Sequence, residues 1–108
     1  MIDEPAMPAA QTYQGIDKDP YGAMNPTGNI IRDAWVFALI PEAETCEGWT
    51  AKRIDALYDQ VTREWDKYGH MVSSLPAELR ERHGRIYGWA VQNAREQGWD
   101  PELEDTDD

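Results

Sequence analysis

Residues 51–68 carry the pattern that most limits how this chain can fold. Large apolar side chains recur there at intervals of three and four, which places them on one stripe of an α-helix and on both faces of a strand. Thr50 is positioned to cap the start of this helix, and Gly69 to end it in a left-handed conformation. The stripe consists of Ile54, Leu57, Tyr58, Val61, Trp65 and Tyr68. The pattern therefore predicts an amphipathic helix over residues 51–68.

A second long helix is predicted over residues 76–97. Pro76 suits a first helical turn, and Gly98 followed by Pro101 stops the helix. Between these signals one face carries Leu79, His83, Ile86, Ala90 and Ala94. In both segments the start signal, the stop signal and the periodicity agree, and such agreement is the best sequence indication of a specific fold.

A shorter helix is predicted over residues 30–40, capped by Asn29 and ended by Pro41. Its residues are apolar on every side, and a short run of this kind is also compatible with a buried strand. We expect a helix because no other segment reads as a strand that could pair with it. Two long helices joined by a short link pack antiparallel. The sequence thus predicts an all-α, three-helix domain over residues 29–100, with the short helix lying across the long pair.

Both ends of the chain are expected to be flexible. Residues 1–28 contain four of the seven prolines and three glycines without any helical or strand period, which is typical of a disordered arm. Residues 101–108 form an acidic tail. The arm still holds Tyr13 and Tyr21, and the sequence leaves open whether it docks on a partner or on the domain itself.

The net charge of −11 lies mostly outside the predicted helices. Residues 51–68 are neutral and residues 69–97 carry +1, whereas residues 98–108 carry −6. A protein that mimics DNA needs rows of acidic side chains on its folded surface. The predicted helices are close to neutral, so an acidic DNA-mimic inhibitor is kept only as an alternative. We also expect no nucleic-acid partner.

We expect a cytoplasmic protein without a membrane partner. The single cysteine, Cys46, excludes an intrachain disulfide, and residues 1–10 have neither a basic nor an apolar leader segment. The longest apolar run, residues 34–40, is far shorter than the roughly 20 residues that span a bilayer.

Cys46, His70 and His83 are the only cysteine and histidine side chains. Their spacing matches no common zinc or iron site, and the glutamates that flank Cys46 disfavour a thiolate. We therefore expect neither a cofactor nor a metal nor catalysis. A metal-binding or enzymatic protein that uses Cys46 with His70 or His83 is the second alternative.

The function that the sequence favours is a non-catalytic protein-protein interaction module, an accessory protein or small subunit of a larger complex. Five tryptophans and five tyrosines are more aromatic surface than three short helices readily bury. Gly84 and Gly88 cost about 1 kcal/mol each inside a helix and face away from its apolar stripe. They indicate either close contact with another segment or a tolerated cost on a solvent face. The predicted contact set, for another protein or a second copy, is Trp35, Phe37, Leu39, Gly84, Gly88 and Trp89.

Overall fold

The computed structural model describes residues 12–100, whose regular elements are all helical. The three principal helices are α3 (Pro26–Val36), α4 (Ala51–Asp66) and α5 (Ala77–Glu96). Two short elements, α2 (Pro20–Ala23) and the 3-10 helix η1 (Val72–Ser74), complete the order. The part of the chain that the structure describes contains no strand. The prediction of an all-α fold with three main helices is confirmed, and the segment that sequence left open between helix and strand is mainly helical.

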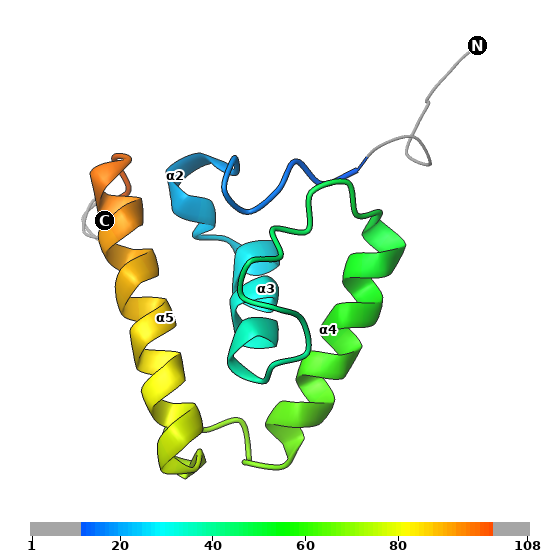
Figure 1. The fold of residues 1–108 in the computed structure, drawn as a ribbon, viewed down its shortest axis with the longest axis vertical. Coiled ribbons are helices and arrows are strands. Elements are labelled where there is room, and N and C mark those ends of the chain that lie inside the picture. The colour runs from blue at the N-terminus through cyan, green and yellow to red at the C-terminus, as the bar shows by residue number, and fades with distance from the viewer. Residues whose placement is uncertain (1–11, 101–108) are drawn as a thin grey trace, which may run out of the picture.

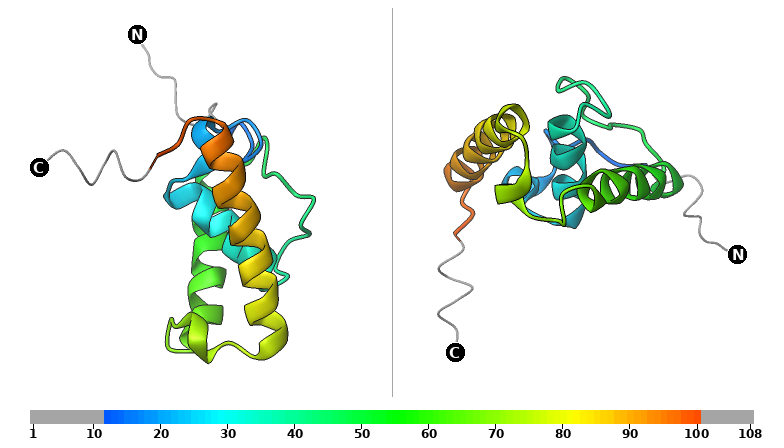
Figure 2. Two further views of the ribbon diagram at one scale, coloured as in Figure 1. Left: turned by 90° about the vertical axis from the view of Figure 1, so that its left-hand side faces the viewer. Right: turned by 90° about the horizontal axis from the view of Figure 1, so that it is seen from below.

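The central element is α3, and the two long helices lie on either side of it (Figure 1). α4 and α5 run in opposite directions, as predicted, but they do not pack chiefly on each other: α4 packs on α3, and α5 packs on both α2 and α3. A helix that is apolar on every side needs cover on more than one face, so α3 is best buried between two neighbours. The connection between α3 and α4, residues 37–50, arches over one face of this arrangement (Figure 2).

The start of α3 differs from the sequence prediction by four residues. Its cap is Asn25 and not Asn29: the Asn25 side-chain oxygen accepts a hydrogen bond from the Gly28 N–H at 2.8 Å. Pro26 then occupies the first turn, where its missing N–H costs nothing. The helix ends at Val36, before the predicted Ile40, because Ala38 adopts a left-handed φ of 58°.

The other two helices follow the sequence prediction closely. The Thr50 hydroxyl accepts a hydrogen bond from the Arg53 N–H at 3.2 Å, as expected of a cap. At the end of α5, Gly98 has a φ of +101° and the Trp99 N–H bonds the Ala94 carbonyl at 3.0 Å. These contacts satisfy helix-end groups that would otherwise lack partners.

Residues 12–28 are part of the folded domain, so the prediction of a flexible arm up to residue 28 is wrong for them. The Tyr13 N–H bonds the Trp49 carbonyl at 2.8 Å, and the Ile16 N–H bonds the Thr45 carbonyl at 3.0 Å. Ile16 and Ala23 are buried in the core cluster. The domain therefore begins at least as early as residue 12, while residues 1–11 and the predicted acidic tail, 101–108, lie outside the described residues.

The main core gathers side chains from this N-terminal segment, from α3, from the α3–α4 connection and from α4. Its buried members are Ile16, Ala23, Ile31, Ala34, Cys46, Trp49, Leu57 and Val61. α5 contributes a second buried row of Ile86, Ala90 and Ala94, as its stripe predicted. No helix among residues 12–100 is long and apolar enough to cross a membrane.

A polar clamp on α3 ties the two long helices together. One oxygen of the Asp33 carboxylate accepts a hydrogen bond from the Trp65 indole N–H of α4 at 3.1 Å. The other accepts one from the Tyr87 hydroxyl of α5 at 2.5 Å. Burial, with a further contribution from Asp33, raises the pKa of Tyr87 well above its ordinary value. Tyr87 therefore stays protonated and donates to Asp33 over the physiological pH range.

Candidate docking surface around Trp89

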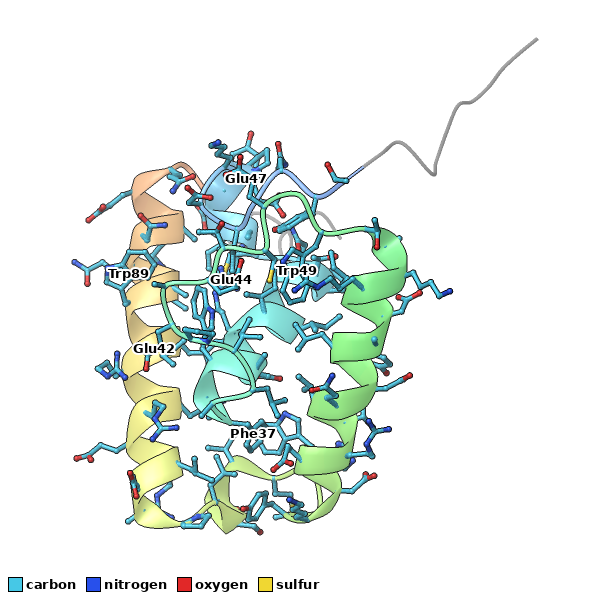
Figure 3. The ribbon with its side chains drawn as sticks, turned by 45° about the vertical axis from the view of Figure 1, so that its right-hand side comes forward. Phe37, Glu42, Glu44, Glu47, Trp49 and Trp89 are labelled. Atoms are coloured by element: carbon cyan, nitrogen blue, oxygen red, sulfur yellow. The ribbon has the colours of Figure 1, made fainter. Side chains whose placement is uncertain are left out.

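Trp89 is the most exposed large hydrophobic side chain in residues 12–100, with 64% of its surface accessible. It lies on α5 beside a buried row, since Ile86 and Ala90 on the same helix are 6% and 1% exposed. Figure 3 shows Trp89 on the same side of the molecule as Glu42, which comes from the α3–α4 connection. The helix periodicity thus places this tryptophan at the border between core and solvent.

A hollow of about 430 Å³ opens next to this side chain and is called the Trp89 groove below. It is lined by Trp35, Glu42, Arg85, Ile86 and Trp89. A smaller hollow of about 140 Å³ shares Trp35, Glu42 and Trp89 and extends the groove toward Ile16 and Arg32. The Trp35 indole N–H donates to the Glu44 carbonyl at 3.1 Å, which fixes the orientation of that ring. The groove therefore has two indoles, one of them held in place.

The charged groups at the groove are paired with each other. Arg85 donates two hydrogen bonds to the Glu42 carboxylate, at 3.1 and 2.9 Å. The hydrogen bond from Arg85 lowers the pKa of Glu42. Both side chains are exposed, so the pair contributes little to stability, but it keeps the groove from presenting an uncompensated charge. Such a surface suits an apolar side chain of another segment.

The structure brings together only part of the predicted contact set. Trp35 and Trp89 line the same groove. Phe37 instead packs on the α4 side, with its ring centroid 5.2 Å from that of Trp65, and Figure 3 places it well away from Trp89. Leu39 packs against the main core cluster. Neither Phe37 nor Leu39 therefore belongs to the groove.

Gly84 and Gly88 lie on the outer face of α5 and are exposed. A Cβ atom added at either position would meet nothing within 4 Å, so no part of the described chain approaches this face closely. The segment 12–28 packs on the α3–α4 connection and, at Gly22, on Ala94 of α5, and not over these glycines. The two interpretations of these glycines, a close contact with a partner and a tolerated cost on a solvent face, both stay predictions.

The structure keeps Cys46 apart from both histidines. Cys46 is fully buried just before α4, whereas the rings of His70 and His83 lie beside Trp65, in the last turn of that helix. A helix of 16 residues is about 24 Å long. Burial, with a smaller contribution from Glu44, raises the pKa of the Cys46 thiol to about 11, opposite to what a nucleophile or metal ligand needs.

No group of three or more histidine, cysteine, aspartate or glutamate side chains among residues 12–100 is arranged to hold a metal ion. His70 instead pairs with Asp66 at 2.6 Å, and His83 stacks on Tyr87 with ring centroids 4.6 Å apart. Within residues 12–100 the structure therefore does not bring Cys46 together with either histidine.

Sequence reasoning missed three side chains that organise the region. Arg85 meets Glu42 across 43 residues, Arg82 donates to the Val36 carbonyl at 2.6 Å, and the buried Arg32 donates to two carbonyls of α2. The contacts of Arg85 and Arg82 depend on tertiary placement and leave no local signal. A lone arginine inside an apolar run is the one signal available for Arg32, because a buried charge needs partners.

Comparison of the chain with protein-family models, with curated protein sequences and with solved structures finds no match.

Proposed function

We propose that this protein is a non-catalytic interaction module that binds another protein through the Trp89 groove. The observation that carries the proposal is Trp89 itself, 64% exposed at the mouth of a groove that already contains Trp35. Tryptophan is enriched among the residues that dominate binding energy at protein interfaces. An apolar groove next to such an exposed side chain supports a docking role.

The domain's own packing does not account for a tryptophan at position 89. The α5 face that meets the core is filled by Ile86, Ala90 and Ala94, all nearly inaccessible to solvent. Trp89 adds an exposed aromatic ring beside this row, and continuous exposed apolar surface is a common mark of an interaction site.

The groove favours a partner segment with one apolar side chain that inserts between the two indoles. Polar neighbours of that side chain would lie over the Arg85–Glu42 pair, whose charges already neutralise each other. Shape and apolar burial would then supply most of the affinity, with little dependence on salt. A different protein is the proposed partner, and a second copy of this chain would appear instead as a change of mass in solution.

The test is co-purification of partners from the native source with variants at two exposed aromatic residues. Trp89→Ala removes the proposed anchor, and Tyr21→Ala is the matched control, since Tyr21 is 57% exposed on α2. Both variants should keep helicity and change the free energy of unfolding by less than about 1 kcal/mol. We expect Trp89→Ala to lose a partner that Tyr21→Ala retains. Retention of every partner by Trp89→Ala at the wild-type level would contradict the proposal.

A further inference from the structure

A second hollow, of about 300 Å³, lies between α3 and α4 and is separate from the Trp89 groove. Its lining includes Ile30 and Asp33 from α3, Tyr58, Thr62 and Trp65 from α4, and His70 just beyond α4. Tyr58 is 52% exposed and His70 is also exposed, so the hollow opens to solvent at these residues. We call it the Asp33 pocket.

The carboxylate in this pocket has neutral hydrogen-bond donors and no direct cationic partner. Its two oxygens accept from the Trp65 indole N–H and from the Tyr87 hydroxyl. None of the salt bridges among the described residues includes Asp33. Each carboxylate oxygen can accept a further hydrogen bond. The negative charge is therefore oriented by the fold and still available to a cation.

The nearest arginine in sequence does not fill this role. Arg32 is 3% exposed and directs its guanidinium to the Gly22 and Ala23 carbonyls. Its charge interacts with Asp33 through space, and none of the salt bridges among the described residues joins the two. Arg32 thus weakens the negative potential at the Asp33 carboxylate but does not occupy the position where a cation would bind it.

Aromatic rings form the other wall of the pocket. The Trp65 indole donates to Asp33, and Tyr58 lies about two helical turns before it on α4. The His70 ring lies at 19° to the Trp65 indole with centroids 6.5 Å apart. An ammonium group is attracted both by a carboxylate and by the face of a tyrosine ring such as that of Tyr58. The chemistry of the lining therefore selects a cation.

We propose that the Asp33 pocket binds a lysine side chain from a basic segment of a partner protein. Asp33 is only partly exposed, so a long side chain is needed to reach it from the surface. The aliphatic stem of lysine can lie along Ile30 and Thr62 while its ammonium meets the carboxylate. The net charge of −11 adds a long-range attraction for a basic segment.

The test is an NMR titration of the full-length chain with the peptide Gly-Gly-Lys-Gly-Gly, blocked at both ends, at constant ionic strength. The readouts are the indole N–H resonance of Trp65 and the backbone amide of Thr62. We expect saturable shifts at both, and none with the same peptide acetylated on its lysine. Equal shifts with the acetylated peptide would overturn the proposal. So would shifts that rise linearly with peptide concentration, without saturation, at amides spread over the whole acidic surface. So would an arginine peptide that binds more tightly than the lysine peptide.

Two variants and two controls sharpen the titration. Asp33→Asn should weaken lysine binding at least about tenfold, because it removes the charge. Tyr58→Ala should weaken it about threefold, and its exposed position keeps the fold intact. Tyr21→Ala should bind as the wild type does. Trp89→Ala should also bind lysine normally, so failure here is distinguishable from failure of the Trp89 groove. Wild-type affinity in both Asp33→Asn and Tyr58→Ala would contradict the assignment.

Discussion

Two pairs of glycines in this molecule differ completely in their surroundings. Gly22 and Gly28 lie in the proline-rich N-terminal segment, and Gly84 and Gly88 lie inside α5. A Cβ atom at Gly28 would stand 2.0 Å from the Ala23 carbonyl oxygen, and one at Gly22 would stand 2.9 Å from Ala94. At Gly84 and Gly88 it would meet open space.

The segment that looked unstructured in the sequence is therefore the tightly packed one. Without a side chain, Gly28 lets α3 begin against α2, and Gly22 lets α2 lie directly on α5. The outer face of α5, where two helix-interior glycines suggested a close contact, is free within the described chain. If these glycines serve a contact, it is one with another molecule.

The largest effect is expected from Gly28→Ala. The added methyl group overlaps a backbone carbonyl, which cannot move without displacing α2 from α5, so we expect a loss of about 3 kcal/mol or more in the free energy of unfolding. Urea denaturation followed by circular dichroism measures the change. Gly84→Ala is the matched control, since it introduces the same methyl group inside a helix without a neighbour. Equal stabilities of the two variants would break the comparison.

Arg32→Met tests the same packed region from its polar side. The substitution leaves the Gly22 and Ala23 carbonyls without the guanidinium that now binds them, and we expect a loss of about 2–3 kcal/mol. The exposed Arg85→Met variant should change stability by less than about 1 kcal/mol. A stabilised Arg32→Met protein would mean that the cost of burying the charge outweighs these hydrogen bonds.

Alkaline pH should loosen the connection that covers the N-terminal segment. Burial raises the pKa of Cys46 from 9.0 to about 11 in the folded chain. A group whose pKa is raised by folding stabilises fully below its unfolded pKa, so this contribution, about 3 kcal/mol, is lost as pH rises from 9 to 11. Chemical denaturation at a series of pH values measures it. Between pH 9 and 10 the free energy of unfolding should fall less steeply for Cys46→Ala than for the wild type. An unchanged slope would count against a buried thiol.

The smallest effect is expected at the open glycines. Gly84→Ala and Gly88→Ala should each raise the free energy of unfolding by about 1 kcal/mol, because alanine favours the helix and meets no neighbour. Thermal unfolding measures this gain. The same variants decide the alternative that sequence left open: stabilisation with weaker partner binding indicates a close contact on this face, whereas stabilisation with unchanged binding indicates a tolerated cost.

The sequence was sufficient for elements whose signals are local. The cap at Thr50, the stripe on α4, the buried row of α5 and its end at Gly98 and Trp99 all follow from neighbouring residues. Tyr58 is the exception on the α4 stripe, because it lies at the stripe's edge and faces solvent. The exposure of Trp89 was also predictable, from its position beside the core face of α5.

The remaining features depend on contacts between distant residues. The pairing of Tyr13 with Trp49 and of Ile16 with Thr45 turns a proline-rich segment into part of the core, and no local pattern announces it. The start of α3 was missed because Pro26 and Gly28 read as helix breakers. In the fold Pro26 occupies a first turn, and Gly28 avoids a collision with Ala23.

The most direct test of the account is photo-crosslinking from position 89 in cells of the source organism. A photoreactive phenylalanine analogue replaces Trp89 in one variant and Tyr21, which is 57% exposed, in another. We expect one discrete cross-linked protein from position 89 and none from position 21. No adduct at position 89, or the same set of adducts from both positions, would contradict the claim that the Trp89 groove is a docking surface.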